Sequence, residues 1–497
     1  MKLELIGHDH KYVVEQSLLA LFPEERPVYG SVDRAADRRY AVITIAEAGD
    51  HCTVTTELGW DGSVASFPQA VTLTGDDYAR EGQRRRAIGM SFFRAAREAT
   101  GIAPPWGSLT GIRPAKVATE LLDRGLSVEE AGAVLEDTYF VTPQRRRLCL
   151  DAALAAAKAD QGRTDRDISL YVGIPFCPTR CAYCSFVSNS VEKSFHLVEP
   201  YLAALRSEIA SAGQMVRDLG LRVRSFYMGG GTPTTLTAAQ MDGLLTCLEE
   251  SFDFSGLLER TVEAGRPDTI TREKLEVLKR HGVDRISVNP QTMEDHVLRA
   301  IGRRHTAADI EAAMETVAAV GFPHVNMDLI AGLPEDTPEG FRRSLERVLS
   351  FGTDNLTIHT LSLKKGSRIT LEGTRIPTVE EVGAMLDYAD PLLRTLGFAP
   401  YYLYRQKYQS GSFENVGWCR SGGEGLYNIY IMEELHSILS MGAGGSTKMV
   451  DRRHSHIERV FNLKFPLEYT QRPEKAAENQ RAFAAFHRAM LQDLQER

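Results

Sequence analysis

The sequence has no apolar run of the roughly 18 residues that a membrane-spanning helix requires. Its first residues, MKLELIGHDH, also lack the apolar central stretch of a secretion signal. We therefore expect a cytoplasmic protein without a membrane span.

Cysteine is scarce, at 7 of 497 positions. Four cysteines are scattered without the spacing of a disulfide framework, which argues against a secreted disulfide-rich scaffold. We expect Cys52, Cys149 and Cys247 to be packed as small apolar residues, whereas a site role for Cys419 stays open. The remaining three cysteines lie close together and need a separate explanation.

An excess of positive charge is also absent, since the formal net charge is -8 and the pI is near 6.0. Such a chain has no general attraction to phosphate backbones or anionic membranes, and a nucleic-acid partner is not expected. The arginine runs at 84–86 and 145–147 are interpreted as solvated helical faces.

The composition is that of a folded protein, with 43% hydrophobic and 25% charged residues, and the length predicts two or three domains. Residues 1–165 indicate an α+β domain of unassigned role. Strand patterns cover 39–46 and 51–57, and helical patterns cover 82–100, 115–124 and 128–136. The segment APPWGSLTGIRP, at 103–114, is too rich in Pro and Gly for either element and predicts a structured loop.

Residues 166–370 alternate between short β-rich runs and helical runs, which is typical of a parallel α/β sheet. Right-handed crossovers would curl this series into a barrel or part of one. The predicted strands are 170–175, 225–229, 261–265, 285–289, 324–330 and 355–360. The alternation fades afterwards, and residues 371–497 predict a smaller α+β domain with a helix at 379–396, a strand at 401–404 and a terminal helix from about 474.

Directly after the first of these strands stands GIPFCPTRCAYCSF, with Cys177, Cys181 and Cys184. Thiolates suit iron-sulfur clusters or zinc. Structural zinc takes four protein ligands, whereas three thiolates on a four-iron cluster leave one iron open to a ligand. The triad thus favours a catalytic cluster; zinc with a remote fourth ligand and unliganded core cysteines are the alternatives.

A glycine run, Gly229, Gly230 and Gly231 followed by Thr232, ends the second predicted strand. Glycines allow the backbone to approach a ligand closely, although a plain turn would use the same residues. Four polar side chains stand at or just after later strands, and each of them could instead belong to a structural ion pair. They are Glu263, Gln291, Arg303 and Asp328.

The CX3CX2C spacing with Tyr183 before the third cysteine resembles the signature of the radical S-adenosylmethionine (SAM) superfamily. The order of motifs is similar to that of the oxygen-independent coproporphyrinogen III oxidase family. The segments PPWGSLTGIRP, PYYLYRQK, ENVGW and MGAGGSTK are most similar to its HemZ branch, often called coproporphyrinogen dehydrogenase. The resemblance implies an α/β fold with a partial (β/α)6 TIM-like barrel, between an N-terminal and a small C-terminal α+β domain.

The resemblance also implies a [4Fe-4S] cluster on the three cysteines, with SAM on its open iron. The implied cofactor contacts are Tyr171 beside the sulfonium, in a catalytic role; Tyr183; the loop Gly229, Gly230, Gly231 and Thr232 for the methionine; Gln291 and Asp328 for the ribose; Arg303 for the methionine carboxylate; and Glu263 for another polar edge.

The implied reaction converts coproporphyrinogen III to protoporphyrinogen IX by removing two propionate carboxyl groups, with electrons from a low-potential donor such as flavodoxin or ferredoxin. Arg113, Arg405 and Lys407 are candidate anchors for the propionates, although exposed cations are usually surface residues. One departure is Phe186, which stands where the better characterised oxidases carry a further cysteine.

Two other functions remain open at this stage. A haem chaperone resembles the related HemW branch, but that branch has a His-Asn pair where this sequence has Tyr427-Asn428. An RNA-modifying radical SAM enzyme would use residues 1–165 to hold RNA, and salt-sensitive tRNA binding would support it.

Overall fold

The computed structural model describes residues 1–109, 111, 113–184, 189–190, 194–362, 375–406 and 410–495. The chain divides into two compact units, one of residues 1–150 with 405–413 and the other of residues 151–404 with 414–497. This division differs from the expected domains 1–165, 166–370 and 371–497. Residues 151–165 and most of the C-terminal part are built into the second unit.

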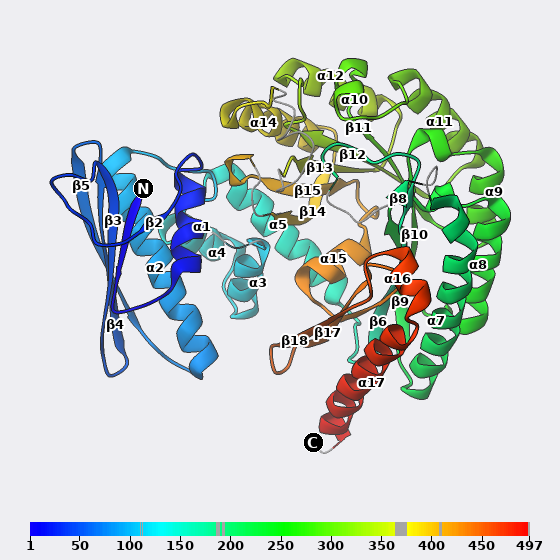
Figure 1. The fold of residues 1–497 in the computed structure, drawn as a ribbon, viewed down its shortest axis with the longest axis horizontal. Coiled ribbons are helices and arrows are strands. Elements are labelled where there is room, and N and C mark those ends of the chain that lie inside the picture. The colour runs from blue at the N-terminus through cyan, green and yellow to red at the C-terminus, as the bar shows by residue number, and fades with distance from the viewer. Residues whose placement is uncertain are drawn as a thin grey trace. The chain divides into compact units, whose positions relative to one another are not determined.

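The first unit is a five-stranded sheet with helices, and its strand order is β2-β1-β3-β4-β5. Its elements are β1 (Lys2–Ile6), α1 (Lys11–Leu21), β2 (Val28–Tyr29), β3 (Arg39–Ala48), β4 (His51–Trp60), β5 (Ser63–Thr72), α2 (Asp77–Thr100), α3 (Ala115–Asp123), α4 (Val128–Asp137) and the start of α5 (Pro143–Asp160). Figure 1 shows α2 lying along the sheet, where its apolar face buries Ile88 and Phe92. The strands and helices predicted here are confirmed.

The second unit contains six parallel strands in sequential order, β6-β9-β10-β11-β12-β13. They are β6 (Asp167–Ile174), β9 (Arg222–Gly230), β10 (Glu259–Gly265), β11 (Arg285–Gln291), β12 (His324–Ala331) and β13 (Asn355–Thr360). Each matches a strand predicted from the sequence. Sequential parallel order is what right-handed crossovers produce, and the partial (β/α)6 barrel is confirmed.

The two faces of this sheet differ in polarity because side chains alternate along each strand. One face carries apolar residues such as Leu170, Phe226 and Val262, which are fully or almost fully buried. The other face is polar, and its residues include Ser169, Tyr171, Ser225, Tyr227, Glu259, Thr261, Glu263, Arg285, Ser287, Asn326, Asp328, Asn355, Thr357 and His359. A polar sheet face inside a barrel provides the groups from which a site can be built.

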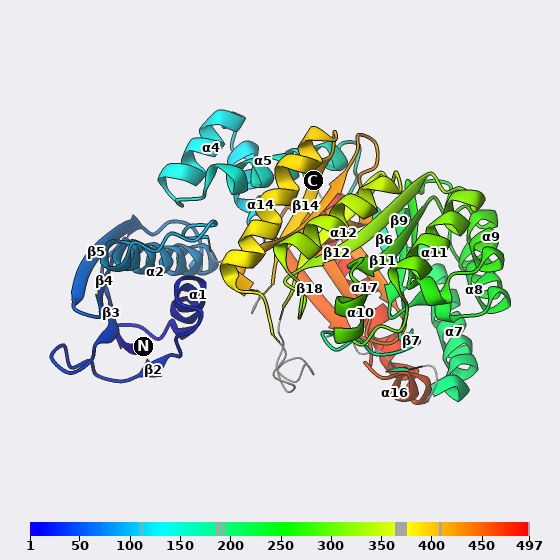
Figure 2. The same ribbon diagram turned by 90° about the horizontal axis from the view of Figure 1, so that it is seen from above.

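Helices cover the apolar face, and Figure 2 shows α8, α9 and α11 on one side of the barrel strands. The helices between the strands are α7 (Val198–Asp218), α8 (Ala238–Ser251), α9 (Arg272–Arg280), α10 (Asp295–Ala300), α11 (Ala307–Val320) and α12 (Pro338–Ser350), and α14 (Val379–Thr395) follows β13. Five of these helices begin after a threonine whose hydroxyl accepts a hydrogen bond from a first-turn N–H, a common helix start. These threonines are Thr237, Thr271, Thr306, Thr337 and Thr378.

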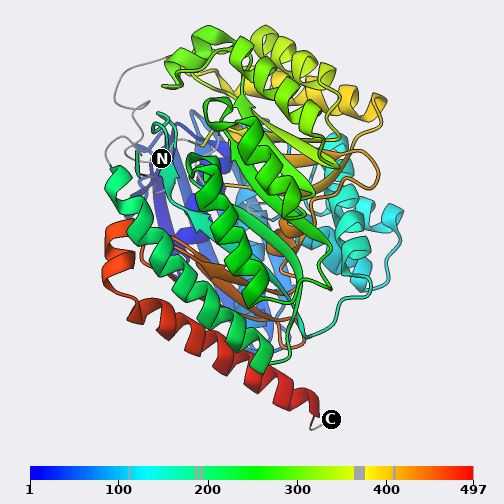
Figure 3. The ribbon, with the colours of Figure 1, turned by 90° about the vertical axis from the view of Figure 1, so that its right-hand side faces the viewer.

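The C-terminal part extends the barrel sheet at both edges. Its elements are β14 (Ala399–Arg405), β15 (Glu414–Cys419), α15 (Leu426–Glu433), β16 (Ser437–Met441), β17 (Ser446–Asp451), β18 (His456–Phe461), α16 (Pro466–Gln471) and α17 (Glu474–Gln495). β15 pairs with β13 in antiparallel orientation, and β16 pairs with β6 in parallel orientation. Figure 3 shows α17 beside α7. No helix in the described part of the chain is both long and apolar enough to span a membrane.

Candidate active site

The three cysteines lie on the loop that follows β6. Cys177 ends the short strand β7 (Phe176–Cys177), and the N–H of Cys184 donates to the Cys181 carbonyl at 3.1 Å. All three side chains are half-buried and none forms a disulfide. The Thr232 hydroxyl lies 3.5 Å from the Cys177 sulfur, which joins the glycine loop after β9 to the cysteine loop.

A second loop, between α10 and α11, supports the other half of the cysteine loop. The Ala182 N–H donates to the Ile301 carbonyl at 3.0 Å, and Arg303 Nη2 donates to the Tyr183 hydroxyl at 3.3 Å. Nη1 of Arg303 donates to the Asn289 carbonyl at the end of β11. The buried guanidinium also interacts with Cys181, so its positive charge stands beside a predicted cluster ligand.

The donor set fits an iron-sulfur cluster, since soft thiol ligands stand together on one short loop. No three His, Cys, Asp or Glu side chains in the described ranges converge as the ligands of a single metal ion would. A four-iron cluster has a different requirement, because each thiolate binds a different iron.

The glycine run after β9 is packed too closely for any side chain. A Cβ at Gly231 would lie 2.5 Å from the Phe176 carbonyl oxygen, and one at Gly229 would lie 2.9 Å from the Glu263 carboxylate. Gly230 has a φ of +105°, which L-residues rarely adopt. These contacts explain the three consecutive glycines better than a plain turn does.

Gln291 ends β11 with a φ of +71°, an unusual conformation for a residue other than glycine. Its side chain is buried, and its Oε1 has no hydrogen-bond partner among the described residues. A buried acceptor without a partner costs about 1–3 kcal/mol. A ligand that donates to this oxygen would recover that cost, which fits the expected role of Gln291 toward a cofactor hydroxyl.

Glu263 and Asp328 each have a hydrogen-bonded partner on the polar face, and their charges interact. The Tyr227 hydroxyl donates to Glu263 Oε1 at 2.6 Å, and the Asn326 amide donates to Asp328 Oδ1 at 2.8 Å. The His359 ring lies 3.6 Å from Asp328 Oδ2. Burial raises the pKa of Glu263 to about 7; the Tyr227 hydrogen bond opposes this rise and the Asp328 charge adds to it.

Tyr171 is one of three stacked tyrosines at this end of the barrel. The Tyr227 and Tyr427 ring centroids are 4.6 Å apart, and Tyr171 stacks on each at 6.2 Å. Burial raises the pKa of all three hydroxyls. Tyr427 was not among the predicted site residues; the sequence set it only against the His-Asn pair of the HemW branch, and the glycines before it, at 422, 423 and 425, were not interpreted.

The N-terminus of α15, which carries Tyr427, is fixed by residues of the barrel interior. The Glu259 carboxylate accepts hydrogen bonds from the N–H groups of Leu426, at 2.5 Å, and Tyr427, at 3.3 Å. Arg285 lies 3.7 Å from Glu259 and donates to the Gly423 carbonyl at 3.0 Å. A buried ion pair on β10 and β11 therefore positions the helix that brings Tyr427 to the site.

The substrate candidates belong to the first unit or lie outside the described residues. Arg405 is buried, and its guanidinium donates to the carbonyls of Ser412 and Leu109 and lies 5.8 Å from the Trp106 ring centroid. These contacts indicate that Arg405 stabilises the loop segments around it. Arg113 is half-buried at the end of the 103–114 loop, and Lys407 and Phe186 lie outside the described residues.

Cys419 is not suited to nucleophilic chemistry. It lies in β15, where burial raises the pKa of its thiol to about 12. Since the thiolate is the reactive form, this cysteine acts as a packed apolar residue.

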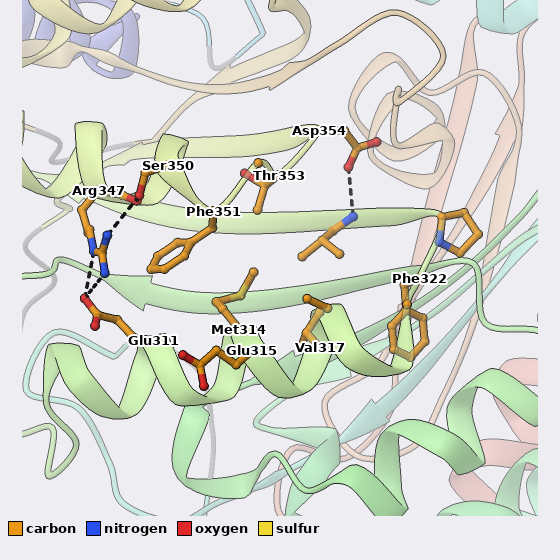
Figure 4. A pocket seen from close by; sticks show the side chains of 15 residues that line it. Glu311, Met314, Glu315, Val317, Phe322, Arg347, Ser350, Phe351, Thr353 and Asp354 are labelled. Atoms are coloured by element: carbon orange, nitrogen blue, oxygen red, sulfur yellow. Dashed lines mark hydrogen bonds and ion pairs between the residues drawn. The ribbon is translucent and has the colours of Figure 1, made fainter.

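A cavity of about 490 Å³ lies away from these residues, between α11 and α12 and near the start of β12. Figure 4 shows Met314, Val317 and Phe351 among its lining residues and the ion pair between Glu311 and Arg347. Chemistry in α/β barrels gathers at the carboxyl ends of the strands, so this cavity is not the active site.

Comparison with known proteins agrees with the site geometry in indicating a radical SAM protein. Residues 171–348 match the family model of the radical SAM superfamily. The chain is 36% identical over 480 residues, 95% of both chains, to the oxygen-independent coproporphyrinogen-III oxidase-like protein HemZ of Bacillus subtilis. It is 31% identical over 303 residues to the haem chaperone HemW of Lactococcus lactis, covering 59% of this chain and 73% of that one.

Among solved structures, the coproporphyrinogen III oxidase HemN of Escherichia coli superposes with a TM-score of 0.52 and 24% identity, over 65% of this chain and 72% of that one. This likeness supports the fold. The cofactors of the superfamily are a [4Fe-4S] cluster and SAM, and the cysteine loop, close-packed glycines and unsatisfied Gln291 oxygen fit them. The chain therefore belongs to the radical SAM superfamily and, within it, to the coproporphyrinogen III oxidase-like family that includes HemZ.

Proposed function

We propose that this protein catalyses the oxygen-independent oxidative decarboxylation of coproporphyrinogen III to protoporphyrinogen IX. The observation that carries the proposal is the 36% identity to the HemZ protein over 95% of both chains, a span that reaches beyond the radical SAM domain. That relative is an oxidase-like protein, so the substrate is part of the proposal.

When bound, the cluster and SAM supply radical chemistry that removes one hydrogen atom from a propionate β-carbon. The propionate then releases carbon dioxide, passes one electron to an external one-electron acceptor and becomes a vinyl group, and two such conversions give the product. Each conversion also requires an electron from a low-potential donor, for which flavodoxin or ferredoxin is suited. The chain's own residues bind and orient the cofactors.

Within this proposal Cys177, Cys181 and Cys184 ligate the cluster. The other contacts follow from hydrogen-bonding chemistry, since carboxylate and amide oxygens accept from ribose hydroxyls and a guanidinium suits a carboxylate. Gln291 and Asp328 bind the ribose hydroxyls of SAM, and Arg303 binds its methionine carboxylate. Glu263 binds another polar edge of SAM, and Tyr171 and Tyr183 lie beside its reactive end.

The substrate has four propionates and requires cationic anchors. Arg113 and Lys407 remain candidates for that role. The buried contacts of Arg405 with two main-chain carbonyls favour a structural role for it instead.

A second candidate function is haem handling, because HemW proteins are also relatives of this chain. The residue that would distinguish the two is Tyr427, which stands where that branch carries histidine. Imidazole is a common haem-iron ligand, whereas the Tyr427 ring is stacked against Tyr171 and Tyr227. The geometry at this position therefore favours the decarboxylation proposal.

The test is an anaerobic incubation of the reconstituted protein with reductant, SAM and coproporphyrinogen III. Formation of protoporphyrinogen IX with 5'-deoxyadenosine and carbon dioxide is expected. If 5'-deoxyadenosine forms without protoporphyrinogen, the substrate assignment is wrong. Stoichiometric haem binding would then favour haem handling, and salt-sensitive tRNA binding would favour RNA modification.

A further inference from the structure

Arg266 follows β10 and makes a buried contact with the cysteine loop. Only 3% of its surface is exposed. Its Nη1 donates to both oxygens of Thr179, to Oγ1 at 2.6 Å and to the carbonyl at 3.1 Å. Its Nε and Nη2 donate to the two carboxylate oxygens of Asp268 at 3.0 and 2.8 Å.

Thr179 is the middle residue of the three that separate Cys177 from Cys181. Arg266 therefore contacts the cysteine loop midway between two of the predicted cluster ligands. The other half of the loop is held from the α10–α11 loop through Ile301 and Arg303.

Because Arg266 is buried, its guanidinium can bond only with the few groups that surround it. A buried guanidinium must be paired, and the Asp268 fork both neutralises part of its charge and fixes its orientation. The nitrogen that remains outside the fork is the one that donates to Thr179. Hydrogen bonds to a charged group contribute more to stability than neutral ones, so the loop conformation depends on this side chain.

We propose that Arg266 is a positioning residue for the iron-sulfur cluster, which fixes the Cys177–Cys181 half of the loop and places a positive charge near the cluster. Net charge around a cluster is one determinant of its reduction potential. Arg266 thus affects both the retention of the cluster and its potential, and these effects do not depend on which substrate the enzyme uses.

The experiment compares Arg266→Met, Arg266→Lys and Thr179→Val with the matched control Arg272→Met, a nearby exposed arginine that pairs with Glu276. Each full-length variant is reconstituted anaerobically. Iron release to a chelator, the paramagnetic signal of the reduced cluster and its reduction potential are measured. Thermal unfolding of the cluster-free protein reports whether the variant is folded.

Arg266→Met is expected to release iron about tenfold faster or more, which corresponds to about 1.4 kcal/mol. Its potential is expected to fall, because Asp268 is left without its cation. Arg266→Lys should restore the potential toward the wild-type value, since the charge is kept. Thr179→Val should release iron about threefold faster with an unchanged potential, because one acceptor is lost and no charge changes.

Wild-type iron release and potential in a folded Arg266→Met variant would overturn the proposal. If Arg266→Met does not fold, the Thr179→Val variant is the test. Iron release from Thr179→Val at the same rate as from Arg272→Met would then overturn the proposal. An effect on thermal unfolding alone, with an unchanged potential in Arg266→Met, would also overturn it, because that result describes a purely structural residue.

Discussion

The Tyr227 hydroxyl donates a hydrogen bond of 2.6 Å to Glu263, across neighbouring strands β9 and β10. The carboxylate is thereby held beside the glycine loop, where a Cβ at Gly229 would contact it. Burial nevertheless raises the pKa of Glu263 to about 7. The protonation of this carboxyl therefore changes within the range of pH in which enzymes are assayed.

The stability of the cofactor-free protein should depend on pH through Glu263. Its folded pKa, about 7, lies above the ordinary value of 4.5, so the folded state binds more protons between these values. The stability of the wild type relative to Glu263→Gln should fall as pH rises from about 4.5 to about 7 and then level off. We expect the stability of the wild type relative to Glu263→Gln to change by about 1–3 kcal/mol across this pH range, as measured by denaturant unfolding.

Tyr227→Phe supplies the companion test. The hydroxyl of Tyr227 lowers the pKa of Glu263, so its removal should move the same stability change to higher pH. An identical pH profile for the wild type and Glu263→Gln would contradict the assignment of this titration to Glu263.

Gly231→Ala should destabilise the site through backbone displacement. The added Cβ would lie 2.5 Å from the Phe176 carbonyl oxygen, and neither partner is a flexible side chain. We expect the free energy of unfolding to fall by about 2–4 kcal/mol, as measured by thermal unfolding. SAM binding should also weaken, as measured by equilibrium dialysis.

The matched control is Gly243→Ala, at an exposed position in α8 where a Cβ meets nothing within 4 Å. It should raise stability by about 0.5–1 kcal/mol, because alanine is the better helix former. A free energy of unfolding of Gly231→Ala equal to that of the wild type would show that the glycine loop has room for a side chain.

Replacement of Cys177, Cys181 or Cys184 by alanine should abolish the cluster. Iron in the anaerobically reconstituted protein should fall from about four atoms per chain to below one, because a missing thiolate leaves an iron without a protein ligand. Cys247→Ala, at a half-buried cysteine on α8, should keep the full iron content. Zinc in place of iron, or iron retained by all three variants, would be incompatible with the assigned ligands.

Arg405→Met should lower stability rather than substrate affinity. The substitution leaves the carbonyls of Ser412 and Leu109 without this donor, at a cost of about 2–3 kcal/mol. Hydrogen exchange in the peptides around residues 106–109 should report the loss, and Arg86→Met, at an exposed position, serves as control. Unchanged exchange with a raised KM would instead support a propionate anchor.

The barrel strands could be predicted from the sequence because each is a short β-rich run bounded by helical patterns. The cysteine loop and glycine run were recognisable for a similar reason, since their residue types and spacing are local. The structure brings Glu263 and Asp328 into one group with Tyr227 and His359, which no local pattern shows.

The contribution of the C-terminal part could not be predicted in the same way. The strand β16 was not predicted, and no local pattern shows that a strand there would pair with β6, far earlier in the chain. For the same reason the sequence did not indicate that Tyr427 reaches Tyr171, since α15 is positioned by Glu259 and Arg285 on distant strands. Of the first unit, β3, β4, α2, α3 and α4 were predicted, whereas β1 and β2, of five and two residues, were not, because such short strands carry little pattern.

The parallel pairing of β6 with β16 has a consequence for how the enzyme matures. A ribosome produces all three cysteines long before it produces Ser437–Met441, so in the growing chain one edge of β6 still awaits its neighbour. Glu259 likewise has no helix N-terminus to bind until Leu426 has been made. The sheet edge that leads into the cysteine loop is therefore completed only after the C-terminal part of the chain has been made.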